Sequence, residues 1–150
     1  SKQKVNLNLL LQQFVMESEG TLPKGMEVSL HLSNETLWVK ADPEKLIRVF
    51  ENLLTNAGRY SLKPSTLVVR TSMESSGFVH ISFSNPAPSL SKEEVEQLFK
   101  RFYKKDQSRT STGSGLGLAI VKSIIHMHNG KVWATSKHST FTINIELPIN

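Results

Sequence analysis

The sequence predicts an α/β two-layer sandwich, in which helices cover one face of a mixed β-sheet. Three observations support this fold class. Residues 66–84 and residues 131–147 each contain two stretches of alternating apolar and polar residues, which is the pattern of half-buried strands. Residues 43–60 carry apolar side chains at helical spacing. Residues 113–130 begin with alternating glycines and continue as a second apolar helical pattern.

The first 40 residues alternate between strand and helix patterns. Residues 5–7 predict a short strand, and residues 8–18 predict an amphipathic helix whose apolar face consists of Leu9, Leu10, Phe14 and Val15. A break at residues 20–23 contains glycine and proline. Strands are predicted after it at residues 26–32 and 37–40.

The helix at residues 43–60 has the clearest boundaries. Asp42 is a favourable N-cap, and Pro43 occupies the first helical position, where its missing N–H costs nothing. Residues 61–64 end the helix with a proline. The predicted buried face consists of Leu46, Phe50, Leu53, Leu54 and Ala57.

Two strands follow, at residues 66–74 and 78–84, and the turn between them at residues 75–77 predicts a hairpin. Residues 85–90 contain two prolines and are predicted to form a loop. Ser91 then caps a short helix, with Glu94 at the position of the second partner in a capping box.

The remaining residues contain an aromatic and basic run at 98–103 and a polar loop at 104–114. The glycine-led helix continues to about His128, where Asn129 and Gly130 end it. The last two strands are predicted at residues 131–136 and 140–147.

Length and composition favour one soluble globular domain spanning residues 1–150. No apolar run reaches the length of about 18 residues that a membrane-spanning helix needs. The five histidines form no metal-ligand pattern, and cysteine is absent. The net charge of +5 is spread along the chain, so nucleic-acid binding is not favoured and we expect no nucleic-acid partner.

The glycines at 113, 115 and 117 predict an anion site. Glycine permits close backbone approach, and the N-terminus of a helix presents unpaired N–H groups. No Gly-Lys-Ser/Thr follows, and no strand precedes, so the motif is neither a P-loop nor a dinucleotide-binding fingerprint. The alternative is a glycine-rich loop that only begins a helix.

A second polar feature lies on the helix at residues 43–60. Asn52, Asn56, Arg59 and Tyr60 recur at spacings of three or four, so they form one stripe beside the apolar face. An asparagine oxygen can bind a magnesium ion that also contacts phosphate, and Arg59 can pair with phosphate. The alternative is a solvated helix edge. Together with the glycines, the stripe favours a polyphosphate ligand.

These motifs resemble, in the same order, those of the ATP-binding catalytic domain of bacterial sensor histidine kinases, which shares a superfamily with DNA gyrase, the Hsp90 chaperones and MutL. ENLLTNAGRYS (51–61) is similar to the N box, LFKRFYK (98–104) to the F box and GSGLGLAIVK (113–122) to the second glycine box. TFTINIELP (140–148) resembles the last strand. The resemblance implies a Bergerat-type fold with a mostly antiparallel sheet and about three helices on one face.

The resemblance also implies a nucleotide site that binds ATP and Mg²⁺. It assigns Asn56 to the metal, Asn52 to the neighbouring polar position, Arg59 to phosphate, Tyr60 to the adenine pocket and Lys104 to the γ-phosphate. Residues 104–114 would form the ATP lid. The other implied nucleotide-binding residues are Asn85, Leu90, Phe99, Arg109, Gly113, Gly115, Leu116, Gly117, Leu118, Ser139 and Thr140.

Two positions decide the expected chemistry. ATP-hydrolysing relatives have a glutamate four residues before the metal-binding asparagine, and here that residue is Asn52, which cannot act as a base. Phosphoryl transfer to a protein histidine is therefore expected rather than hydrolysis. The first glycine box, which normally carries an aspartate for adenine, falls on Asn85–Ser89, where Asn85 offers a neutral amide and two prolines stiffen the loop.

In the family, the phosphoacceptor histidine lies on a preceding helical hairpin. The resemblance therefore implies a cytoplasmic domain of a membrane-anchored sensor, with its own dimerisation domain and a response regulator as partners. The isolated domain is expected to be monomeric, to bind ATP and not to autophosphorylate. Two alternatives remain open: a degenerate docking module with weak nucleotide binding, and a serine kinase of the anti-sigma type.

Overall fold

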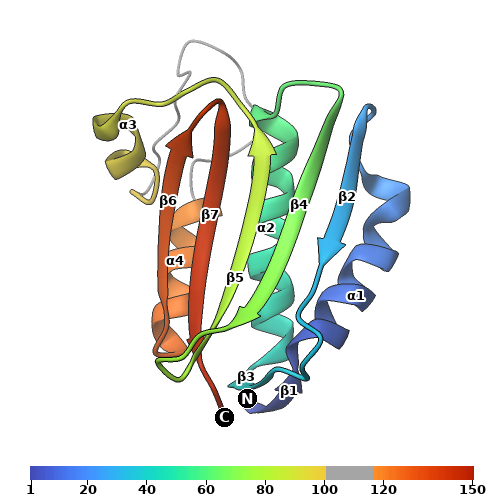
Figure 1. Cartoon of the computed structure of the whole chain (residues 1–150), viewed down its shortest axis with the longest axis vertical. Helices are drawn as coiled ribbons and strands as arrows, with labels where there is room; N and C mark the ends of the chain where they lie inside the picture. The colour runs from blue at the N-terminus through green and yellow to red at the C-terminus, as the bar shows by residue number, and fades with distance from the viewer. Residues whose placement is uncertain (101–116) are drawn as a thin grey trace.

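The computed structural model describes residues 1–100 and 117–150. Its main sheet has the strand order β2-β4-β5-β7-β6 (Figure 1). The strands are β2 (Met26–His31), β4 (Ser65–Met73), β5 (Phe78–Pro86), β6 (Lys131–Lys137) and β7 (Thr140–Pro148). β2 and β4 are parallel, and all the other neighbours are antiparallel. The prediction of a mixed, mostly antiparallel sheet is therefore confirmed.

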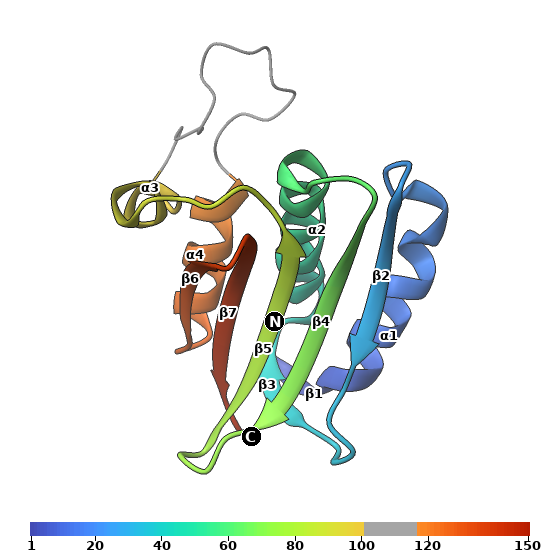
Figure 2. The same ribbon diagram turned by 45° about the horizontal axis from the view of Figure 1, so that its top comes forward.

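Three helices lie side by side on one face of this sheet: α1 (Leu7–Ser18), α2 (Pro43–Tyr60) and α4 (Gly117–Met127) (Figures 1 and 2). The short helix α3 (Lys92–Gln97) lies beside one end of β6, and a 3₁₀ turn, η1 (Glu19–Thr21), follows α1. This arrangement confirms the two-layer sandwich. None of the described helices combines the length and the apolar character needed to cross a membrane.

The first strand differs from its prediction. β1 (Gln3–Asn6) pairs with β3 (Trp38–Ala41) in a separate two-stranded sheet and does not join the main one. Leu7, predicted as the end of this strand, is instead the first residue of α1 and is fully buried. The side chain of Asn6 explains the boundary, because its oxygen accepts a hydrogen bond from the Leu9 amide at 3.2 Å.

The helix α2 has the predicted boundaries. The Asp42 carboxylate accepts hydrogen bonds from the amides of Glu44 and Lys45 at 3.1 and 3.3 Å. Its buried residues are Leu46, Val49, Phe50, Leu53 and Ala57, whereas Leu54 is only partly buried. Phe50 stands at the centre of the core, between the rings of Phe14 on α1 and Phe83 on β5, with centroid distances of 5.7 and 6.0 Å.

The strand β5 is two residues longer than predicted. Asn85 and Pro86, expected in a loop, pair with Phe141 and Thr140 of β7. Proline is tolerated here because it is the last residue of the strand. After the strand, the predicted capping box is present, since Ser91 and Glu94 exchange side chain-to-backbone hydrogen bonds at 3.1 and 3.0 Å.

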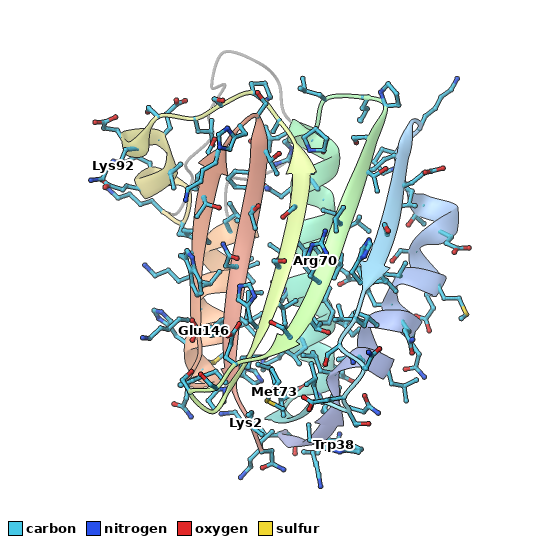
Figure 3. The ribbon with its side chains drawn as sticks, viewed as in Figure 1. Lys2, Trp38, Arg70, Met73, Lys92 and Glu146 are labelled. Atoms are coloured by element: carbon cyan, nitrogen blue, oxygen red, sulfur yellow. The ribbon has the colours of Figure 1, made fainter. Side chains whose placement is uncertain are left out.

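The face of the sheet opposite the helices is polar. Arg70 and Glu146 lie on it, turned away from the helical layer (Figure 3). Side chains on the neighbouring strands β5 and β7 bond to each other there: Ser84 bonds to Thr142, its direct partner in the ladder, at 2.7 Å, and His80 bonds to Asn144, a diagonal neighbour, at 2.9 Å. The residues on the inner face of β5 and β7 are those that approach the helices and the site described next.

Candidate functional site

A cavity of about 390 Å³ opens where α2 ends, beside the end of β5 and the turn between β6 and β7. This volume is within the range that suits small-molecule ligands. Its lining residues are Asn56, Arg59, Tyr60, Ala87, Pro88, Leu90, Leu98 and Phe141. The cavity therefore combines an apolar wall with a few polar groups, all of the latter from the last turns of α2.

Three residues of the stripe predicted on α2 line this cavity. Asn56, Arg59 and Tyr60 line it, and the Arg59 guanidinium lies 5.9 Å from the centroid of the Tyr60 ring. Asn52 lies one turn earlier, and its amide nitrogen is buried without a hydrogen-bond partner among the described residues. Such an orphaned donor is costly unless a ligand or water accepts its hydrogens.

The residues present fit a magnesium ion that is shared with phosphate. Asn56, whose side chain carries an amide oxygen, lines the cavity, and the unpaired Asn52 amide indicates that a hydrogen-bond acceptor belongs nearby. Residues 1–100 and 117–150 contain no group of three or more His, Cys, Asp or Glu side chains that could hold a metal by themselves. Mg²⁺ commonly takes one or two protein oxygens and completes its shell with phosphate and water.

The opposite wall of the cavity is held in place by hydrogen bonds of its backbone groups, two to other backbone groups and one to a side chain. The Ala87 amide donates to the Ser139 carbonyl at 3.0 Å, and the Leu90 amide donates to Ser136 Oγ at 2.9 Å. The Leu62 amide after α2 donates to the Pro86 carbonyl at 3.0 Å. Residues 86–90, which stand where the family resemblance would place a glycine-rich loop, are therefore bonded to β6, to the turn that follows β6 and to Leu62 after the end of α2.

The turn between β6 and β7 provides the carbonyl that accepts the hydrogen bond from Ala87. His138 and Ser139 both adopt left-handed backbone conformations, with φ of 51° and 55°, which is the geometry of a tight two-residue hairpin turn. Neither Ser139 nor Thr140 is among the lining residues. Ser139 contributes its carbonyl to Ala87, and the exposed Thr140 hydroxyl lies 3.5 Å from the His138 carbonyl.

Phe141 lines the cavity instead, and the sequence analysis did not single it out. It pairs with Asn85, so both side chains point from the sheet toward the helices. The signal was present in the alternation of β7, where every second residue from Phe141 onward is buried. Ala87, Pro88 and Leu98 were also missed as lining residues, since apolar residues in a loop resemble any other core contact.

Asn85 lies directly behind this wall. Only 3% of its surface is exposed, and its amide nitrogen donates to the Pro86 carbonyl at 3.2 Å. The amide oxygen is the acceptor group of this side chain, and accepting a hydrogen bond is the capacity that the expected base-binding role requires.

The glycine motif is described only at its end. Lys104, Arg109, Gly113, Gly115 and Leu116 lie outside the described residues, and their predicted roles stay predictions. Gly117 begins α4, and the neighbouring Leu118 is 8% exposed and packs in the core. Leu90 lines the cavity, whereas Phe99 packs against the core without being a lining residue.

Comparison with known proteins agrees with this geometry. Residues 41–149 match the family described as histidine kinase-, DNA gyrase B- and HSP90-like ATPase. Sensor protein VanS of Enterococcus faecium is 37% identical over 151 residues, covering 99% of this chain and 38% of VanS. The signal transduction histidine-protein kinase BaeS of Escherichia coli (strain K12) is 35% identical over 131 residues, covering 84% of this chain and 27% of BaeS.

The chain thus spans less than half the length of these curated relatives. Among solved structures, the nucleotide-free catalytic domain of histidine kinase ThkA matches with a TM-score of 0.85 and 26% identity, covering 99% of this chain and 96% of that domain. Fold, sequence and the ordered motifs agree. The chain belongs to the family of histidine kinase-, DNA gyrase B- and HSP90-like ATPases.

Proposed function

We propose that this chain binds ATP with Mg²⁺ in the cavity beside the end of α2 and presents the γ-phosphate for transfer to a protein histidine. The observation that carries the proposal is the convergence of Asn56, Arg59 and Tyr60 on one apolar cavity of about 390 Å³. A purine base needs an apolar slot, and a polyphosphate needs donors and a cation at one end of it.

The lining residues can be divided into those suited to the base and those suited to the polyphosphate. Tyr60, Leu98 and Phe141 offer apolar and aromatic surface to the base, with the Asn85 oxygen behind them as a hydrogen-bond acceptor. Arg59 offers a cation to phosphate, and Asn56 would hold the magnesium ion. The ion supplies charge neutralisation for the phosphate oxygens when it is bound.

Transfer to a protein side chain is favoured over hydrolysis by residue 52. The Asn52 amide can donate and accept hydrogen bonds, but it cannot take a proton from an attacking water. Catalysis would then consist of positioning the nucleotide and neutralising its charge.

The wider setting of this activity also belongs to the proposal. VanS and BaeS are named as sensor and signal-transduction proteins and extend well beyond the part matched here. By analogy, the acceptor histidine would lie on a separate dimerisation domain, and a response regulator would take the phosphoryl group from it. The chain would then be one cytoplasmic domain, over residues 1–150, of a membrane-anchored sensor kinase, and monomeric when isolated.

Calorimetric titration of ATP–Mg²⁺ into the 150-residue chain tests the proposal. We expect a dissociation constant between micromolar and sub-millimolar values, and a loss of about tenfold or more in Asn56→Ala, because a metal or phosphate contact disappears. Thr55→Ala is the matched control, since Thr55 is the preceding residue of the same helix and does not line the cavity.

Asn85→Ala tests the base-binding part of the site. We expect it to weaken ATP binding by about three- to tenfold, because a hydrogen bond to the base is lost, and to leave the binding of magnesium tripolyphosphate unchanged. If the wild-type chain shows neither heat nor thermal stabilisation at millimolar ATP, nucleotide binding is contradicted. The docking-module alternative would then be favoured.

A further inference from the structure

His128 occupies a buried position at the end of α4, remote from the cavity. Only 4% of its surface is exposed, and both ring nitrogens have partners. Nδ1 lies 2.8 Å from the Ile124 carbonyl, and Nε2 lies 3.1 Å from the backbone nitrogen of Asp42. A backbone N–H can only donate, so Nε2 accepts, and the proton of the neutral ring is on Nδ1 and is donated to Ile124.

The bond to Asp42 connects the two helices that frame the candidate site. α2 and α4 pack side by side and run in opposite directions (Figures 1 and 2). The end of α2 carries Asn56 and Arg59, and α4 begins with Gly117, the last glycine of the motif, so both site-bearing ends are at one edge of the molecule. His128 and Asp42 join the two helices at the opposite edge.

A directional bond is needed here because the rest of the contact is apolar. The buried side chains of α4 are Leu118, Val121, Ile124 and Ile125, and those of α2 are likewise apolar. The interdigitated apolar side chains set the separation of the helices, but apolar attraction has no preferred direction, so a hydrogen bond adds a further restraint on sliding along the helix axes. The hydrogen bond that the Asp42 amide donates to the buried His128 ring restricts that sliding.

The end of α4 makes two further hydrogen bonds. The Gly130 amide donates to the Ile125 carbonyl at 3.0 Å, and the Lys2 ammonium donates to the Met127 carbonyl at 2.5 Å. Lys2 lies at the lower end of the molecule, close to both chain termini (Figure 3). His128 therefore joins the start of α2 to a helix end that is also bonded to Lys2, the residue before β1.

We propose that His128 is a positioning residue for the nucleotide site: its neutral ring sets the axial position of α4 relative to α2, so losing or protonating the ring weakens nucleotide binding. This inference rests on the proposed function. It assigns His128 no contact with the nucleotide. Its effect is transmitted by the two helices.

Protonation removes the bond for a simple reason. An imidazolium carries hydrogens on both nitrogens, so Nε2–H would face the Asp42 N–H, donor against donor. The surrounding charges are the ammonium groups of Lys2, which precedes β1, and of Lys40 on β3, which line the same cavity as His128. To these are added the carboxylate of Asp42 at the start of α2 and the amino group of Ser1 that pairs with it. The segment Pro148–Asn150 completes the cavity without an ionisable side chain.

Two substitutions at His128 test its two hydrogen bonds separately. His128→Gln can place an amide oxygen near the position of Nε2, keeping an acceptor for the Asp42 N–H without a titratable group. His128→Asn can donate to Ile124 as Nδ1 does, but is too short to reach Asp42. ATP–Mg²⁺ affinity is measured by calorimetry for wild type and both variants from pH 5.5 to 8, with thermal melting and amide exchange of Asp42 as parallel readouts.

At pH 7.5 we expect His128→Asn to bind ATP–Mg²⁺ about three- to tenfold more weakly and to lose the protection of the Asp42 amide against hydrogen exchange. We expect His128→Gln to retain both the affinity and the protection within about twofold. As the ring becomes protonated on acidification, the wild-type affinity should fall by about the same factor relative to His128→Gln, which controls for titration of the nucleotide and of other side chains. The pH comparison needs only these two proteins, so it remains decisive if His128→Asn does not fold.

Equal affinities for the two variants, or parallel pH profiles for wild type and His128→Gln, would overturn the inference while leaving the proposed function intact. Absence of ATP binding by the wild-type chain would overturn both.

Discussion

The backbone amide of Ala87 donates a hydrogen bond to the carbonyl of Ser139, at 3.0 Å. The segment that follows β5 is thereby attached to the turn between β6 and β7, and Ser136 adds a second attachment through the Leu90 amide at 2.9 Å. Pro88 in this segment, and Pro86 immediately before it, reduce its freedom further. One wall of the candidate nucleotide cavity is therefore preformed, although the family's usual glycines are absent from it.

The attachment at Ser136 can be tested by Ser136→Ala. The variant removes the acceptor for the Leu90 amide, so the wall should loosen and ATP–Mg²⁺ affinity should fall by about two- to fivefold. Thr135→Ala is the control, because Thr135 pairs with Thr142 on the open face of the sheet, whereas Ser136 pairs with Phe141 on the inner face. Equal affinities for the two variants in calorimetry would contradict a role for this attachment.

Phe141 should contribute more to binding than Thr140, although only Thr140 is implied by the family resemblance. Phe141→Leu keeps an apolar side chain but removes aromatic surface from the cavity, and we expect about a fivefold or larger loss of ATP affinity. Thr140→Ala should change affinity by less than twofold, since Thr140 is exposed and does not line the cavity. A larger loss of ATP affinity in Thr140→Ala than in Phe141→Leu would contradict the assignment of Phe141 to the cavity wall.

Gly130→Ala should destabilise the fold. A Cβ atom at Gly130 would lie 2.3 Å from the Glu146 carbonyl oxygen and 3.0 Å from side-chain atoms of Ile125 and Leu147. Backbone of β7 would have to move, so we expect a loss of about 3 kcal/mol in unfolding free energy, or roughly 6–12 °C in melting temperature. Gly20→Ala meets nothing within 4 Å and should melt within about 2 °C of wild type.

Asp42 should make stability depend on pH at the acid end. The amino group of Ser1, together with the amides of Lys45 and Glu44, lowers the pKa of Asp42 below its usual value, against a smaller opposing effect of burial. A depressed folded-state pKa contributes stability above the unfolded pKa of about 3.9, and that stability is lost as the pH falls through the folded value.

Asp42→Ser removes the carboxylate charge but keeps the N-cap function, because the serine hydroxyl can still accept hydrogen bonds from the helix amides. The melting temperature of wild type should exceed that of Asp42→Ser at pH 6, and the difference should shrink as the pH falls below 4. A difference that stays constant or grows with acidification would show that the carboxylate is not stabilised in the folded state.

The sequence predicted the elements that local rules control. Asp42 and Pro43 define the start of α2 by capping chemistry alone, and Ser91 with Glu94 define α3 in the same way. The stripe of Asn56, Arg59 and Tyr60 was predictable because helical spacing fixes which side chains share a face.

Features that depend on distant partners were not predictable from local patterns. Asn85 and Pro86 belong to β5 only because β7 pairs with them, and Pro86 by itself favours a loop. β1 and β3 form their own sheet through a pairing of segments about 35 residues apart, which neither segment indicates. The bond from His128 to Asp42 spans 86 positions and likewise has no local signal.

The most direct test of the nucleotide site is amide NMR of the 150-residue chain, titrated with ATP–Mg²⁺ and, separately, with magnesium tripolyphosphate. We predict that ATP shifts the amides of Asn56, Arg59, Ala87 and Phe141, and that tripolyphosphate shifts those of Asn56 and Arg59 but not that of Phe141. Shifts confined to residues away from this cavity, or no shifts at millimolar ATP, would contradict the assignment of the site.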